Sequence, residues 1–426
     1  MDAKRRLTGI AAWGAAAVMA ALMAATGYAP PAYAHGEAAD EPFLKDLTVA
    51  FYDVHISPTV VKVGEPVTIT GKVKVLETWP FTLDPPDTGY INVVAPGPVF
   101  ALRERTINGI PTIGSIVTKR GETYEFKMVM LGRMTGRWHV HPGFALMGTG
   151  TLIGPGEWVS VEPSGQPFVF PVTLLDGSTV NLETVGSGGV WWWAFAAFLI
   201  GMVWMIYWTV PKRTITRLAV NIQIPTPDIG KDFGLITDED YKWSRFLGAI
   251  TIALLVIGWI YIESQYHLRL PQQTDRFAPG SITPSMDEMS KTVQVKPVAA
   301  VFDNANDTLT LRFNVANLGS SPLTVKQYTI GMESFVNGGK DEVAKAGPAD
   351  FVAPLEVQNG TIAPGQSAEV TLKMKSEGFE AERLMPLRDP QELVGGLLFL
   401  QDAAGKTYPI TVRVMVRPTE FRTQYF

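Results

Sequence analysis

The sequence of 426 residues contains no cysteine. This absence excludes disulfide frameworks, thiolate zinc sites, iron–sulfur clusters, blue-copper centres and cysteine nucleophiles. A metal ion bound by this chain must therefore take its ligands from histidine, carboxylate, methionine or backbone groups.

Charge is also scarce, because Asp, Glu, Lys and Arg make up 18% of the chain, against about 25% in ordinary soluble domains. The 36 basic residues do not outnumber the 41 acidic residues, and the formal net charge is −5. We therefore expect no nucleic-acid partner, which would need a basic face. Hydrophobic residues reach 46%, which favours a protein that is partly embedded in a lipid bilayer.

Residues 1–34 have the pattern of a cleaved secretory signal peptide. Three basic residues at positions 4–6 precede an apolar stretch at about 7–27, and Ala32-Tyr33-Ala34 supplies the small residues of a cleavage site. Cleavage there makes His35 the new N-terminus. The alternative is a retained first membrane helix.

Two regions, 35–188 and 267–426, show short alternating apolar patterns that are broken by Gly and Pro. The alternating apolar residues include Val67, Ile69, Val73, Val75, Tyr124, Phe126, Met128 and Met130 in the first region, and Leu309, Leu311, Phe313, Val315, Val370, Leu372 and Met374 in the second. A period of two predicts half-buried strands, and their spacing predicts antiparallel sandwiches or small barrels. From residue 268 onward the chain has no histidine, so the second domain is expected to lack metal ligands.

Two apolar runs separate these regions, and we predict transmembrane helices at 189–210 and 246–266. Tryptophan and tyrosine cluster at the ends of the first run, as in the aromatic belts of membrane helices. The loop at 211–245 is rich in Lys and Arg, which predicts a cytoplasmic loop and places both β-domains outside. Within this loop, Asp238-Glu239-Asp240 is interpreted as a solvated turn.

Only five histidines are present, and three of them suggest a metal site. His139 and His141 are two residues apart, so on a strand their rings project from one face while Trp138 and Val140 project from the other. After cleavage His35 offers two more nitrogens, its α-amine and its ring. Four nitrogen donors favour Cu(II), with zinc as the rival metal.

The remaining polar candidates are interpreted as structural or solvated. His55 lies within an early strand and His267 follows the second apolar run. Glu37 is interpreted as a surface charge rather than an oxygen ligand. The sequence shows no phosphate loop and no nucleophile elbow.

Several motifs together resemble the B subunit of the particulate methane monooxygenase and ammonia monooxygenase family. They are His35-Gly36-Glu37, Gly136-Arg137-Trp138-His139-Val140-His141, Ile153-Gly154-Pro155-Gly156-Glu157-Trp158 and Gly395-Gly396-Leu397-Leu398-Phe399. They occur in order, and the resemblance covers nearly the whole mature chain.

The resemblance implies a mainly β fold of two cupredoxin-like domains, linked by two transmembrane helices. It implies copper as the cofactor, with the metal ligands His35, His139 and His141, and it leaves catalytic residues unassigned. Some methane-type members have further histidines that form a one-copper site. Ala50 and Lys74 stand at those positions here, so that site is expected to be absent.

The resemblance also implies partners and a location. The partners are the A and C membrane subunits, in a trimer of heterotrimers, together with the lipid bilayer. The location is the bacterial inner or intracytoplasmic membrane, with both β-domains on the periplasmic or lumenal side.

The expected function is therefore the copper-binding B subunit of a membrane monooxygenase that hydroxylates methane, another short alkane or ammonia with O2. Trp138 favours the hydrocarbon-oxidising members. The alternative is a non-enzymatic periplasmic copper-binding or copper-delivery protein, although such proteins are shorter and lack the plan of two domains and two helices.

Overall fold

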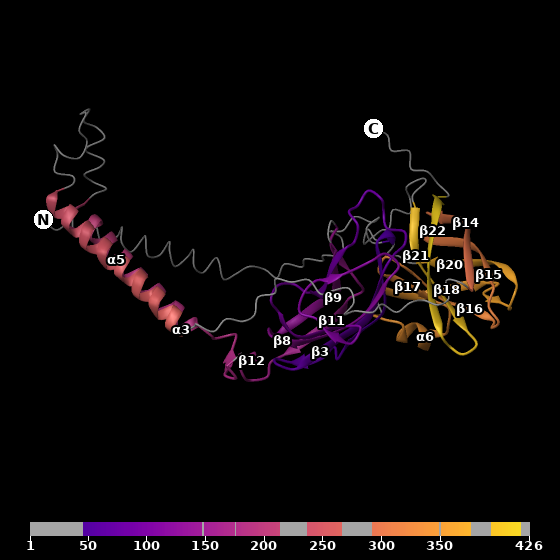
Figure 1. Cartoon of the computed structure of the whole chain (residues 1–426), viewed down its shortest axis with the longest axis horizontal. Coiled ribbons are helices and arrows are strands. Elements are labelled where there is room, and N and C mark those ends of the chain that lie inside the picture. The colour runs from indigo at the N-terminus through magenta and orange to yellow at the C-terminus, as the bar shows by residue number, and fades with distance from the viewer. Residues whose placement is uncertain are drawn as a thin grey trace, which may run out of the picture. The chain divides into compact units, whose positions relative to one another are not determined.

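The computed structural model describes residues 46–146, 149–174, 176–213, 237–265, 292–348, 351–375 and 393–418. These residues form two compact units. The first contains two β-domains, and the second, Phe168–Gln272, contains two long helices (Figure 1). The mainly β class that we predicted is confirmed. The signal peptide, His35, Glu37 and His267 lie outside the described residues, as does the loop at 214–236.

The first β-domain is a sandwich of two sheets, with strand orders β1-β3-β8-β5-β6 and β2-β11-β9-β4-β7. Strand β10 also pairs with β9, outside the strand order of the second sheet. The strands are β1 (Val49–Ser57), β2 (Val60–Lys62), β3 (Pro66–Val75), β4 (Thr88–Val94), β5 (Phe100–Ile107), β6 (Ile110–Pro111), β7 (Ile116–Val117), β8 (Thr123–Gly132), β9 (Gly136–Leu146), β10 (Gly150–Ile153) and β11 (Glu157–Glu162).

The core of this sandwich consists of the alternating residues that the sequence indicated. From β3 and β8 these are Val67, Ile69, Val73, Val75, Tyr124, Phe126, Met128 and Met130, each at most 1% exposed. They pack against Ile91, Val140, Phe144 and Val159 of the opposite sheet. Side chains alternate between the two faces of a strand, so the residues directly before and after each core residue point away from the core. This alternation decides which side chains of β9 can form a site.

The second β-domain is a closed barrel. Its strands pair in a ring in the order β16-β17-β18-β20-β15-β14-β22-β21, and β21 pairs back with β16. The elements are β14 (Val293–Asp303), β15 (Thr308–Asn317), β16 (Leu323–Ile330), β17 (Glu333–Val336), α6 (Lys340–Lys345), β18 (Val352–Gln358), β19 (Thr361–Ile362), β20 (Ser367–Lys375), β21 (Leu393–Asp402) and β22 (Thr407–Pro418). The alternating residues predicted for β15 and β20 lie in its core.

The two β-domains are in direct contact within the first unit. The ring of Tyr52 meets that of Phe399 edge to face, at 5.1 Å between centroids. Both belong to a small buried apolar cluster with Ala50, Leu76 and Leu397. The second domain therefore packs directly against the first.

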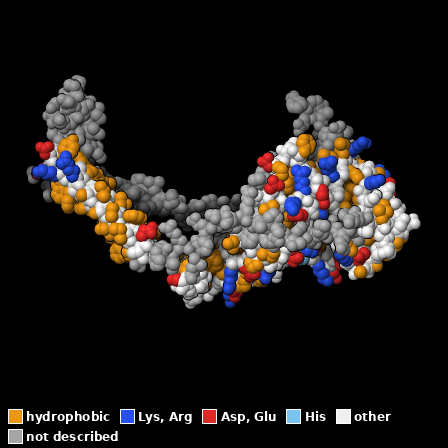
Figure 2. Space-filling view, in the orientation of Figure 1, with side chains coloured by type: hydrophobic (Ala, Val, Ile, Leu, Met, Phe, Trp, Pro, Cys, Tyr) orange, Lys and Arg blue, Asp and Glu red, His pale blue; other side chains and the backbone are white. Residues whose placement is uncertain are grey.

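The second unit contains a hairpin and two helices long and apolar enough to cross a membrane. The elements are β12 (Pro171–Thr173), β13 (Thr179–Asn181), α3 (Ser187–Thr209) and α5 (Asp238–Gln265). Figure 2 shows hydrophobic side chains along these helices. The start of α3 meets the end of α5, where Gly258 leaves room for the Trp193 ring, and Tyr207 contacts Trp243 near the opposite ends. The helices thus form an antiparallel hairpin.

Helix α5 begins at Asp238, within the segment 211–245 that we predicted to be a loop. The interpretation of Asp238-Glu239-Asp240 as a solvated turn is wrong for Asp240. Its side chain is 1% exposed. Tyr207 Oη donates to it at 2.5 Å, Lys212 Nζ lies at 2.7 Å, and the backbone N of Thr237 donates at 2.7 Å. A carboxylate in the first turn of a helix is stabilised by the free backbone N–H groups and the dipole there. Asp240 therefore starts α5 and binds the end of α3.

Candidate metal centre

His139 and His141 lie on β9, in the middle of the second sheet of the first β-domain. His139 is paired across the strands with Trp158 of β11, and His141 with Val94 of β4. Val140 between them is fully buried in the core, and Trp138 is half-buried against the same core. The alternation predicted for this segment is thus observed, and it directs the two imidazoles to one face.

The two imidazoles lie close together, with His141 Nε2 at 3.1 Å from His139 Nδ1. On its other side, His141 Nδ1 lies at 2.8 Å from the carbonyl oxygen of Gly154. Because a carbonyl oxygen only accepts, His141 donates from Nδ1, and its Nε2 presents a lone pair to His139. In the metal-free protein this contact needs a proton on His139 Nδ1.

The arrangement fits a metal site, because the two facing nitrogens can become two ligands of one ion. With metal–nitrogen bonds of about 2.0–2.1 Å, a separation of 3.1 Å corresponds to an angle of about 95–100° at the metal. The bond from His141 Nδ1 to a backbone carbonyl is the usual outer contact of a metal-binding histidine, and it fixes the tautomer. Metal binding would replace the proton that the two rings share.

Two glycines in the loop before β11 let the backbone pass close to the rings of His141 and Phe51. A Cβ on Gly156 would overlap the His141 ring, and a Cβ on Gly154 would lie 2.6 Å from Cγ of Phe51. The backbone at 154–156 can therefore pass directly beside the buried imidazole. His141 is 5% exposed as a result.

Aromatic rings cover the other sides of the pair. Trp158 stacks on His139, at 4.7 Å between centroids and 22° between planes. Phe351 lies nearly parallel to His139 at 6.5 Å and edge to face with His141 at 6.3 Å. Phe351 belongs to the second β-domain, and no local sequence pattern pointed to it.

The other sequence candidates lie elsewhere. His55 is exposed on β1, paired with Thr70. Within the described ranges, no group of three or more His, Asp or Glu side chains could hold a metal ion. Ala50 and Lys74, named for a second copper site, are direct cross-strand partners, and Lys74 Nζ lies 3.5 Å from Glu77 Oε1.

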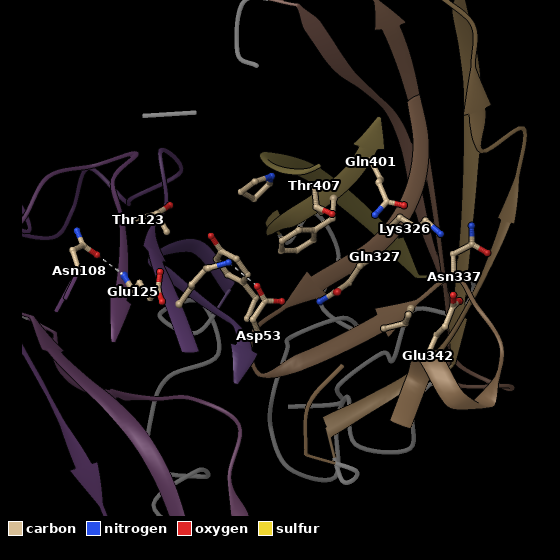
Figure 3. A pocket seen from close by; sticks show the side chains of 15 residues that line it. Asp53, Asn108, Thr123, Glu125, Lys326, Gln327, Asn337, Glu342, Gln401 and Thr407 are labelled. Atoms are coloured by element: carbon tan, nitrogen blue, oxygen red, sulfur yellow. Dashed lines mark hydrogen bonds and ion pairs between the residues drawn. The ribbon is translucent and has the colours of Figure 1, made fainter. Parts of the chain in front are cut away.

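A polar cavity of about 830 Å³ lies between the two β-domains, and no sequence pattern indicated it (Figure 3). Its labelled residues come from both domains, with Asp53 and Glu125 on one side and Lys326 and Gln327 on the other. Lys72 Nζ pairs with Asp53 at 3.0 Å. No histidine is among its described lining residues, so it is separate from the imidazole pair.

Comparison with known proteins gives a match over most of the chain. A family model that describes the B subunit protein of monooxygenases matches residues 36–420. The particulate methane monooxygenase alpha subunit of Methylococcus capsulatus is 32% identical over 414 residues, which cover 96% of this chain and 98% of that protein.

Two solved structures are similar to smaller parts of the chain. The crystal structure of the cupredoxin domain of amoB from Nitrosocaldus yellowstonii is 16% identical with a TM-score of 0.25, covering 30% of this chain and 95% of that chain. The periplasmic chaperone SfaE is 10% identical with a TM-score of 0.18, covering 30% of this chain and 58% of that chain.

Proposed function

Because the chain belongs to the family of monooxygenase B subunits and is thus one component of a monooxygenase complex, we propose that it is the copper-binding component of that complex. The observation that carries the proposal is the pair of imidazole nitrogens 3.1 Å apart on one face of β9. A bound copper ion would supply one-electron and O2 chemistry, which no side chain of this protein supplies.

In this proposal the ligands are the rings of His139 and His141 together with the α-amine and ring of His35. The orientation of the His141 ring is already fixed, because its Nδ1 donates a hydrogen bond to the Gly154 carbonyl oxygen. His139 completes the pair by giving up its Nδ1 proton. The α-amine has an ordinary pKa of about 7.7–8.0, so a metal displaces its proton readily near neutral pH.

We propose that the complex contains A and C membrane subunits, assembled as a trimer of heterotrimers. It hydroxylates methane, another short alkane or ammonia with O2. The β-domains lie on the periplasmic or lumenal side of the membrane. Turnover of the whole complex with methane, butane and ammonia, each supplied alone, identifies the substrate.

The metal site is tested by replacing its ligands one at a time in the full chain. His139→Ala or His141→Ala should lower the affinity for Cu(II) by at least about 100-fold, because each removes one nitrogen of a chelate. The measurement is a Cu(II) titration of the purified full chain, after intact mass has confirmed a start at His35.

His55→Ala is the matched control, since this imidazole is exposed on another strand and should leave the affinity within about twofold. Equal copper binding by the wild type and the His139/His141 double variant would contradict the proposed site.

A further inference from the structure

The second β-domain supplies one wall of the proposed copper site, although it supplies no ligand. Phe351 lies directly before β18 and is 7% exposed. Its ring faces both imidazoles, parallel to His139 within 13° and nearly perpendicular to His141 at 74°. One side chain of the second domain therefore contacts both candidate ligands of the first.

The surroundings of this contact are apolar and closely packed. Ile153, which directly precedes the Gly154 carbonyl on His141, is buried within the core cluster of the second domain. Val94, the cross-strand partner of His141, packs against the same cluster. A void of only about 10 Å³ separates Pro155 of the first domain from Pro348 and Phe351 of the second. The junction of the two domains thus includes residues that flank the histidines.

We infer that Phe351 is a positioning residue for the metal site that holds the His139 and His141 rings in their ligating orientation. This inference rests on the proposed function. His139 stacks on Trp158 at 4.7 Å and lies parallel to the ring of Phe351 at 6.5 Å, so rotation of its imidazole would disrupt both arrangements. His141 already has a fixed partner in the Gly154 carbonyl, and the edge contact with Phe351 limits its remaining freedom.

The consequence is a thermodynamic link between metal binding and docking of the two domains. Residues outside the ligand set that orient metal-binding histidines typically contribute about 10- to 100-fold to metal affinity. If docking favours the ligating orientation, copper must favour docking to the same extent, because such couplings are reciprocal.

The test compares variants of the purified full chain by Cu(II) titration and by the electron paramagnetic resonance spectrum of bound Cu(II). Phe351→Ala should weaken Cu(II) binding by about 10- to 100-fold and broaden the nitrogen couplings in the spectrum. Phe351→Leu keeps an apolar side chain and preserves the fold, but it has no flat face to lie against His139. We expect a smaller loss of affinity with a spectrum that still differs from that of the wild type.

Phe399→Ala is the matched control, because it removes a ring of the same size from the same domain junction without touching either histidine. Its Cu(II) spectrum should be that of the wild type, and its loss of affinity should be smaller than that of Phe351→Ala, because it weakens docking without freeing either imidazole. A wild-type spectrum and affinity for Phe351→Leu, or an equal loss in Phe399→Ala and Phe351→Ala, would overturn the inference. A wild type whose copper binding does not depend on His139 would instead overturn the proposed function, and this inference with it.

Discussion

At the scale of single residues, the absence of a side chain matters as much as the histidines themselves. His141 can be buried beside a backbone carbonyl only because residue 156 has no Cβ. The bond from His141 Nδ1 to the Gly154 carbonyl then decides which nitrogen faces His139. The absence of a Cβ at position 156 is therefore needed to orient the His141 ring as a ligand.

Gly156→Ala should weaken Cu(II) binding by about 10- to 100-fold, because the added methyl group must displace the His141 ring. The measurement is a Cu(II) titration of the full chain, with circular dichroism to confirm that the β-structure is retained. Gly339→Ala is the control, since a Cβ there meets no atom within 4 Å. An unchanged affinity in Gly156→Ala would mean that the ring tolerates displacement.

At the scale of elements, the two helices are long enough to cross a bilayer, and the side chain of Asp240 joins them at one end. At about 1.5 Å per residue, the 23 residues of α3 span about 35 Å and the 28 residues of α5 about 42 Å, against a bilayer core of about 30 Å. The first turn of α5 carries Asp240, which joins Tyr207 and Lys212 at the end of α3. The hydrogen bond to Asp240 raises the pKa of Lys212 above its ordinary value, so this ammonium loses its charge only at a higher pH than a free lysine does.

Asp240→Asn should loosen this end of the helix hairpin, because it removes the charge that Lys212 pairs with. Since the chain has no cysteine, introduced cysteines at positions 213 and 246 would carry the only two spin labels. We expect the distribution of distances between the labels to broaden in Asp240→Asn and to stay narrow in the control Glu239→Gln, whose side chain is exposed. Equal distributions in the two variants would contradict a role for Asp240 in joining the helices.

The features that the sequence predicted correctly depend on residues near each other in the chain. Alternation along β3, β8 and β15 predicted the cores, and the spacing of His139 and His141 predicted that their rings share a face. Phe351 could not be predicted in this way, because its contact with His139 joins residues more than 200 positions apart. Asp240 was misinterpreted for the same reason: its burial depends on Tyr207 of α3 and on Lys212, which follows that helix.

At the scale of the whole molecule, the order of the elements predicts a topology. Two β-domains flank a hairpin of two helices, each long and apolar enough to cross a bilayer. Because the helices run antiparallel, the chain enters and leaves the hairpin on the same side. Lys and Arg in the connecting loop favour the cytoplasm for the opposite side.

Protease added to spheroplasts should therefore digest both β-domains and leave the connecting loop intact. An epitope inserted at position 225, within the loop, should become accessible only after the membrane is permeabilised. The same epitope placed at the C-terminus, after the second β-domain, is the control and should be accessible from the start. Protection of the C-terminal epitope would mean that only one helix crosses.

The closed ring of the second β-domain also limits how a neighbouring protein can bind. Each strand of that ring has a hydrogen-bonded neighbour on both sides, whereas the two sheets of the first domain end in β1 and β6 and in β2 and β7. A partner that binds by adding a strand needs such an end strand, because only there are backbone N–H and C=O groups unpaired. Among the described strands, β2, β6 and β7 of the domain that carries the histidines are thus ends at which a strand could be added, whereas in the second domain only the short β19, which pairs with β16 alone, ends the strand order.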